Sequence, residues 1–297
     1  GTSKPLVADD QSKTYQALVQ SGDQELANQY APYLSSYWGE QSNTAPYYAG
    51  AIIVFLFVAG FFFADKKYIW WLLPVSIISI VMSWGDNFSS VNYFLFDYLP
   101  GYNKFRSVTF ALVLILIAMP LLGMIGLEQI LKQNLGKPER RKLLIIFCAT
   151  GGLAFLLWLS GGFGTFLKDS ESQLPVWLTE AMKADRSALL SADAIRSGVF
   201  ISIFFVIVYF ELHRKLSALA VYAILFLLVA IDIGSVDKRY FNEQNYRRKS
   251  DDAVQLTEAD QRILSDKGNY RVYNLQNPLG EAHTSYFHQS LGGYHGA

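Results

Sequence analysis

Apolar residues gather into long blocks between Tyr48 and Ser235, and shorter polar stretches separate these blocks. The six blocks have 16 to 20 residues each and cover 48–64, 69–84, 108–127, 143–160, 197–212 and 216–234. Their 106 residues include only two charged side chains, Glu211 and Asp232. The hydrocarbon core of a bilayer requires about 20 apolar residues per helix, within a range of about 17–25. The pattern therefore predicts an all-α polytopic membrane protein with about six transmembrane helices.

Composition excludes several other classes of protein. Of the 297 residues, 52% are hydrophobic and 17% are charged, whereas soluble domains carry about 25% charged residues. An ordinary soluble enzyme and a disordered chain are thus excluded, and the single cysteine, Cys148, excludes an internal disulfide. Basic and acidic residues are equal in number, 25 each, so no net field favours nucleic acid. We expect the lipid bilayer as a partner, and no nucleic acid.

The distribution of basic residues between the loops predicts the orientation, because lysine and arginine gather on the cytoplasmic side. The loops at 65–68, 128–142 and 213–215 hold nine basic residues in 22 positions. The alternate loops, 85–107 and 161–196, hold six in 59. The first group is therefore expected to be cytoplasmic, and both ends of the chain are expected to be extracytoplasmic.

This topology divides the chain into three parts. Residues 1–47 form an outward N-terminal segment, 48–235 form the six-span transmembrane domain, and 236–297 begin an extracytoplasmic soluble domain. The string YRVYNL at 270–275 alternates as a strand does, so we expect that domain to be α/β. The polar start of the chain and its unmarked end at LGGYHGA indicate an internal fragment of a longer protein.

Three of the four histidines, His283, His288 and His295, lie in the last 15 residues. Their separations of five and seven residues match no standard zinc pattern, and no cysteine accompanies them. We therefore predict no metal site there, and no cofactor is evident elsewhere in the sequence.

The loop at 85–107 carries most of the candidate chemistry. Its middle, VNYFLFDYL, is apolar apart from Asp97 and is too short to span, which predicts an interfacial helix or a short re-entrant piece before a Pro-Gly turn at 100–101. Lys104 and Arg106 follow. One interpretation is that they contact lipid headgroups. The other is that they hold an anionic phosphate, to which a guanidinium can bind in a bidentate manner.

Acidic and amide groups supply further candidates. Asp86 and Asn87 follow a glycine at the end of the second span, where they form either a turn or a base or metal-ligand site. Asp232 lies about one turn from the outer end of the sixth span. An ionisable residue inside a membrane suggests a function, although this position would also let Asp232 reach the interface.

Two other features receive structural interpretations. Between 174 and 189 the apolar residues of the loop at 161–196 follow helical spacing, which predicts an interfacial helix packed on the spans. Gly123 and Gly126 are three residues apart, which is not the four-residue spacing of a tight helix-pair motif, so we assign them no role.

Several strings together resemble the YfhO-like bacterial membrane proteins of the Bacteroidetes type. The residues that carry the resemblance are YWGEQSNTAPYYAGAIIVFLF at 37–57, WWLLPVSIISIVMSWGDNF at 70–88, YLPGYNKFRSVTFALVLI at 98–115, DIGSVDKRYFN at 232–242 and TSYFHQSLGGYHGA at 284–297. They cover about half of the chain. The resemblance implies a multi-pass protein of the bacterial inner membrane, related to the GT-C glycosyltransferases that use polyprenyl-phosphate donors.

The resemblance also implies roles for the candidate residues. A sugar would move from a polyprenyl-phosphate carrier to an extracytoplasmic glycan or polymer acceptor. Arg106 and Lys104 would contact the lipid phosphate, and Asp86 would be a secondary acidic group, a candidate for catalysis. Three more residues of the outward surface would line the site: Asn87, Asp97 and Asp232. Such enzymes usually carry their catalytic carboxylate in the first outward loop, which would precede residue 1.

Two alternatives to a glycosyltransferase remain. A transporter of lipid-linked glycans predicts charges near the middle of the membrane and inverted repeats, and the sequence contains neither. A non-catalytic membrane scaffold that presents its outer domain fits the sequence as well, because the presumed base is not in it.

Overall fold

The computed structural model describes most of the chain: residues 12–21, 34–39, 47–104, 107–132, 136–161, 164–212, 216–241, 243, 246 and 254–293. The chain divides into two compact units. Gly1–Leu99 and Ser107–Tyr240 form the first, and Pro100–Arg106 and Phe241–Ala297 form the second. We refer to them as unit 1 and unit 2.

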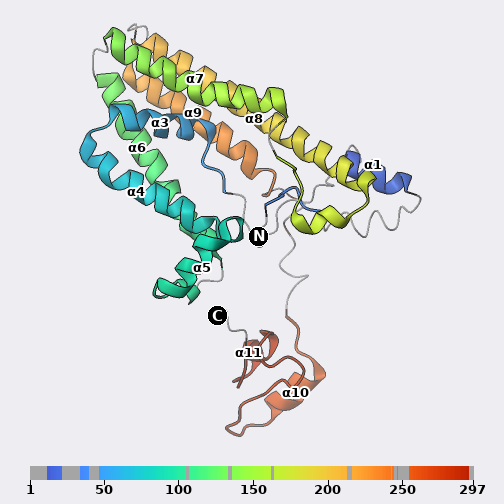
Figure 1. The fold of residues 1–297 in the computed structure, drawn as a ribbon. Coiled ribbons are helices and arrows are strands. Elements are labelled where there is room, and N and C mark those ends of the chain that lie inside the picture. Colours follow the sequence, from blue (N-terminus) through green and yellow to red (C-terminus); the bar gives the residue numbers. More distant parts are fainter. Residues whose placement is uncertain are drawn as a thin grey trace. The chain divides into compact units, whose positions relative to one another are not determined.

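The secondary structure of unit 1 consists of helices joined by irregular segments among its described residues, and each of the six apolar blocks contains a helix (Figure 1). These helices are α3 (Ala51–Phe63), α4 (Lys66–Ser83), α6 (Leu112–Lys132), α7 (Lys137–Ser160), α8 (Val176–Leu212) and α9 (Ala218–Asp237). Four of them, α6, α7, α8 and α9, are long and apolar enough to cross a membrane. In the case of α6, this length includes the preceding turn from Val108. The chain is therefore a helical membrane protein, as the hydropathy pattern predicts.

Helix α3 lies at the centre of unit 1. Ile52, Phe55, Leu56 and Ala59 are buried in a cluster that also contains side chains of α6, α7, α8 and α9. The side chains of α3 that are exposed, Val54 and Phe62, are apolar as well, as expected of a helix in a membrane, which is hydrophobic all round.

Glycines bring α3 and α6 into backbone contact. A Cβ atom on Gly126 would lie 2.7 Å from the Cα atom of Gly60, and one on Gly123 would lie 2.8 Å from the Cβ atom of Leu56. Small residues allow such close approach between helices in a membrane. Assigning Gly123 and Gly126 no role was therefore wrong, because packing requires glycine at these positions without the standard spacing.

The segment 161–196, predicted to be a loop with its own interfacial helix, has a different structure. Instead of a separate interfacial helix, α8 is one helix of 37 residues that begins at Val176 and runs through the fifth apolar block. No glycine or proline lies between Pro175 and Gly198, so nothing ends the helix where its hydropathy changes. At about 1.5 Å per residue, α8 is about 55 Å long. A hydrocarbon core is about 30 Å thick, so the charged N-terminal part of α8 extends beyond it.

Three segments pack on this N-terminal part of α8, and we call the assembly the α8 platform. The segments are α1 (Lys13–Gln20), residues 34–39 and residues 164–175, which include a 3-10 turn at Asp169–Gln173. Leu18 of α1 is buried against Leu178 and Met182 of α8, and Figure 1 shows α1 beside the start of α8. The N-terminal segment thus folds onto a loop more than 150 residues away.

At the C-terminal end of α4 the chain turns sharply. A 3-10 turn at Gly85–Phe88 leads into α5 (Ser89–Tyr98), and the chain bends by 105° between α4 and this pair (Figure 1). The predicted helix in VNYFLFDYL and the turn at 100–101 are both confirmed.

Unit 2 contains α10 (Glu258–Ser265) and α11 (His283–Phe287) among its described residues, but no strand. The segment 270–275 pairs at one place only, a parallel bridge between Val272 and Ser290. The expected strand is absent there because its alternate side chains have nothing to pack on: Tyr273 and Leu275 are both exposed.

Candidate functional site

The residues predicted to form one site belong to both units. Asp86, Asn87 and Asp97 lie in unit 1 at and beyond the α4–α5 bend, and all three are exposed. Lys104 is exposed in unit 2, in a 3-10 turn at Tyr102–Lys104. Arg106 lies outside the described residues. The phosphate-binding role of Lys104 and Arg106 therefore stays a prediction.

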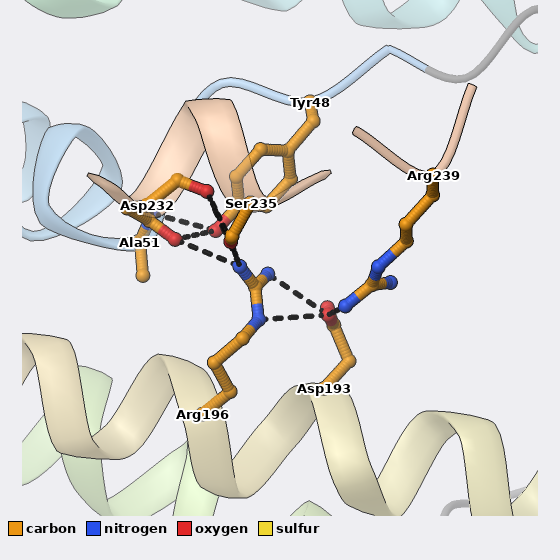
Figure 2. A network of polar contacts seen from close by, with 7 residues as sticks. All are labelled: Tyr48, Ala51, Asp193, Arg196, Asp232, Ser235 and Arg239. Atoms are coloured by element: carbon orange, nitrogen blue, oxygen red, sulfur yellow. Dashed lines mark hydrogen bonds and ion pairs between the residues drawn. The ribbon is translucent and has the colours of Figure 1, made fainter. Parts of the chain in front are cut away.

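Asp232 is the centre of a buried polar network in unit 1 (Figure 2). Its carboxylate accepts hydrogen bonds from the Tyr48 hydroxyl at 2.8 Å, the Ala51 N–H at 2.7 Å and Arg196 Nη1 at 2.9 Å. The first N–H groups of a helix have no partner within it, and Ala51 is the first residue of α3. Asp232 thus caps α3 from another helix. It is buried and does not reach solvent, so its position near the end of α9 serves this internal contact.

Arg196 connects that carboxylate to a second one. Figure 2 shows Arg196 between Asp232 and Asp193. Its Nη2 atom lies 2.8 Å from Asp193 Oδ1, and Arg239 approaches the same oxygen at 3.7 Å. The Arg196 guanidinium also lies over the Tyr48 ring, 5.0 Å from its centroid. Two aspartates and two arginines make this network neutral, and it ties α8 to the end of α9 and the start of α3.

A second buried charge, Arg186, holds the α8 platform together. Its side chain is fully buried and binds Glu171 through two hydrogen bonds of 2.6 and 2.8 Å. It also donates to the backbone carbonyl groups of Ser35 and Phe166, at 2.7 and 2.6 Å. Burial acts to raise the pKa of Glu171, but hydrogen bonds from Arg186 and from the Lys168 N–H outweigh it and lower this pKa below its ordinary value.

Asp185, the residue before Arg186, caps the N-terminus of α1, as Asp232 caps that of α3. Its carboxylate accepts hydrogen bonds from the backbone N–H groups of Lys13 and Thr14 at 3.0 and 2.8 Å. The hydroxyl groups of Ser12 and Thr14 donate to it as well, at 2.8 and 2.7 Å. A carboxylate at a helix N-terminus is favoured by the helix dipole. The platform is therefore fixed to α8 by two adjacent charged residues.

The α4–α5 bend meets the platform at Tyr37. The Asn87 side-chain amide donates to the Tyr37 hydroxyl at 3.3 Å. Lys168 Nζ lies 5.8 Å from the centroid of the Tyr37 ring. We call Tyr37, Asn87 and Lys168, with Asp86 beside Asn87, the Tyr37 cluster. An ammonium, a phenol, an amide and a carboxylate from three separate segments can together contact a phosphate and the hydroxyl groups of a sugar.

Unit 2 has its own polar group, built on Asp260. This carboxylate accepts from the Thr257 N–H at 2.8 Å, pairs with His288 Nε2 at 2.9 Å and lies 3.8 Å from His283 Nε2. Hydrogen bonds from Thr257 and His288 lower the pKa of Asp260 to about 2. No group of three metal-ligating side chains exists in the described part of the chain, and His295 lies outside it. The contact between Asp260 and His288 joins α10 to the end of α11.

Sequence reasoning missed Arg186, Arg196 and Lys168. One signal for Arg186 was present: it lies four residues after Met182 and eight after Leu178, on the apolar face of the amphipathic segment. A charge on such a face needs a buried partner. Arg196 and Lys168 carry no comparable local signal, because Asp232 and Tyr37, which they contact, lie far away in the sequence.

Comparison of the chain with protein-family models, with curated protein sequences and with solved structures found no match. The resemblance to the YfhO-like proteins therefore rests on the strings that carry it. Any assignment of function depends on those strings and on the contacts of the described residues.

Proposed function

We propose that this chain is the membrane part of a GT-C type glycosyltransferase that moves a sugar from a polyprenyl-phosphate carrier to an extracytoplasmic glycan. The observation that carries the proposal is the Tyr37 cluster, where Tyr37 contacts the Asn87 amide and the Lys168 ammonium at the end of a membrane helix, and Asp86 precedes Asn87 in the sequence. A lipid-linked sugar presents its phosphate and its first hydroxyl groups at this depth. The YfhO-like strings at 37–57 and 70–88 include three of the four cluster residues.

The proposed topology has six spans in the bacterial inner membrane, with both ends extracytoplasmic. The 13 residues of α3 extend about 20 Å, and residues 47–50, which precede it without helical structure, add up to about 13 Å. Together they match a hydrocarbon core of about 30 Å. Every backbone polar group must be satisfied within that core. Asp232 contributes to this by accepting the first N–H of α3.

The cluster supplies the groups that the reaction needs. The acceptor hydroxyl oxygen attacks the anomeric carbon, the bond from that carbon to the phosphate oxygen breaks, and the carrier leaves as polyprenyl phosphate. Lys168 would bind the phosphate, a role that the family resemblance gives to Lys104 and Arg106. Asn87 and Asp97 would bind sugar hydroxyl groups, and Asp86 would take the proton of the acceptor. Asp232, being buried, would act by positioning α3.

Transfer assays on membranes from cells that produce the full-length protein test this proposal. The donors are undecaprenyl-phosphate glucose and undecaprenyl-phosphate N-acetylglucosamine, each radiolabelled in the sugar. Lys168→Met and Arg106→Ala are expected to lower transfer to polymer at least tenfold while the amount of inserted protein stays the same. Lys183→Met, which removes an exposed ammonium of α8, is the control. Wild-type transfer by both variants would refute the phosphate-binding roles.

A specific observation favours a non-catalytic scaffold as the second candidate. Asp232, Asp185 and Arg186 each bind structural partners, so none of them stands ready for proton transfer. A scaffold predicts no transfer from either donor by the wild-type protein. Loss of transfer in Asp86→Asn by about 10²-fold or more would instead identify Asp86 as the base. Unchanged transfer in Asp86→Asn would show that Asp86 is not the base.

A further inference from the structure

Helix α5 buries none of its ten residues. Its large side chains are open to the surroundings: Tyr93 is 62% exposed, Phe94 59%, Phe96 49% and Tyr98 74%. The rings of Phe94 and Tyr98 pack on each other, with centroids 5.1 Å apart. Each exposed aromatic side chain in water forgoes about 1.5–3 kcal/mol of burial free energy. A helix with this surface therefore needs an apolar environment other than its own chain.

The side chains of α5 divide between two sides of the helix. With 3.6 residues per turn, Val91, Phe94, Leu95 and Tyr98 lie on one side. Ser89 and Asp97 lie on the opposite side, together with Tyr93 and Phe96. One side therefore carries only apolar and aromatic side chains, while the other combines a hydroxyl and a carboxylate with aromatic rings. Helices with an apolar side and a mixed side lie at membrane interfaces, where tyrosine gathers.

The bend relative to α4 gives the direction of α5. A change of direction by 105° is 15° more than a right angle. If α4 runs along the membrane normal, the ten residues of α5, about 15 Å long, descend only about 4 Å toward the membrane centre. The interfacial layer on each side of the hydrocarbon core is about 5–8 Å thick. A re-entrant segment would need a change of direction much closer to 180°.

The apolar surface of α5 continues from the surface of α4. Ile77 and Ile78 on α4 are more than half exposed, and Trp84 and Phe88 at the bend are 44% and 42% exposed. Tryptophan and tyrosine gather where a spanning helix leaves the hydrocarbon. Exposed apolar side chains thus occur along α4, at the bend and on α5.

We propose that α5 is a membrane-interface helix, whose partner is the boundary between headgroups and acyl chains at the end of α4. Phe94 and Tyr98 face the acyl chains, and Asp97 faces water. This inference is independent of the proposed glycosyl transfer, because it rests on exposure, side-chain arrangement and the bend alone.

Depth measurements on the reconstituted protein test this. In a Cys148→Ser background, single cysteines replace Phe94, Asp97 or Tyr98, and Ile78 serves as the reference in α4. Nitroxide labels are attached, the protein is placed in phosphatidylcholine–phosphatidylglycerol vesicles, and collision rates with oxygen and with a water-soluble nickel chelate give the depth of each label. Because the native side chains are exposed, the labels fit without repacking.

The expected result is that labels at 94 and 98 lie about 5–10 Å below the phosphate level, and the label at 97 lies above both. All three should be shallower than the label at 78. Depth that increases steadily from 94 to 98 toward the membrane centre would overturn the proposal in favour of a re-entrant piece. Full access of all three labels to the nickel chelate would overturn it in favour of a helix in water.

Discussion

Arg186→Met removes the charge that joins α8 to the other segments of the platform. Arg186 is fully buried, and its five hydrogen bonds reach Glu171 and the carbonyl groups of Ser35 and Phe166. Methionine fills much of the same space but donates nothing. The variant therefore leaves a carboxylate and two carbonyl oxygens without their partner, while the helix itself is retained.

The size of the effect depends on the groups that lose their partner. Removing one partner of a buried ion pair costs about 3–5 kcal/mol, since the other charge remains buried. The Glu171 side chain is 13% exposed, so water relieves part of this cost, and we expect about 3 kcal/mol. At 1.4 kcal/mol per tenfold change, this corresponds to roughly 150-fold more frequent opening of the platform.

Hydrogen exchange followed by mass spectrometry measures that opening directly, in the amides of residues 34–39 and 164–175. Lys183→Met is the matched control on the same helix: its partner is Glu180, both side chains are exposed, and such pairs contribute about 0–1 kcal/mol. Adding Glu171→Gln to Arg186→Met removes the stranded charge and should recover more than tenfold of the protection. If Arg186→Met accelerates exchange no more than Lys183→Met does, the platform does not depend on the buried pair.

Three further predictions concern packing, capping and pH. Gly126→Ala places a methyl group 2.7 Å from the backbone of α3 and should lower the free energy of unfolding by about 1–3 kcal/mol; thermal unfolding in detergent checks this, with Gly152→Ala, which meets nothing within 4 Å, as the neutral control. Tyr48→Phe removes the hydroxyl that binds Asp232 and should speed exchange at the start of α3 about fivefold, with exchange in α10 unchanged. Because the pKa of Asp260 is lowered to about 2, its contribution to unit 2 is complete above pH 4 and is lost as the pH falls toward 2. Exchange in α10, corrected for its intrinsic pH dependence, should reveal this loss; constant protection from pH 5 to 2 would contradict it.

Hydropathy predicts the membrane helices well because backbone polar groups inside a bilayer must be satisfied within the segment. A long apolar block that crosses the bilayer as a single segment must therefore form a helix, and each of the six blocks contains one. The same reasoning fails at 176–196, where charges end the apolar block. Helix continuity there depends on the absence of proline and glycine, and α8 continues through the change in polarity.

Pairing between distant segments leaves no periodic trace in the sequence. Tyr48 and Asp232 are 184 residues apart, and Ser35 and Arg186 are 151 residues apart. Periodicity shows which side of a helix is apolar but not which segment covers it. The sequence shows that Asp232 lies in an apolar block. It does not show that Asp232 caps α3, because Asp232 itself belongs to α9.

Two segments of the α8 platform carry Tyr37 and Lys168, so the geometry of the Tyr37 cluster depends on the contacts that hold these segments. Tyr37 belongs to residues 34–39 and Lys168 to residues 164–175, and both segments are held by Arg186 through the Ser35 carbonyl and Glu171. The edge-to-face contact between Trp38 and Phe166, at 5.2 Å, joins the same two segments to each other. In the proposed enzyme, Arg186 would thus be a positioning residue, since it fixes the segments that carry the cation and the phenol. Loss of Arg186 should separate Lys168 from Asn87 on the α4–α5 bend, and transfer should fall although every proposed binding residue is still present. A small displacement of a bound phosphate is enough for this, because an error of about 1 Å in the placement of a reacting group can cost about 10²-fold in rate.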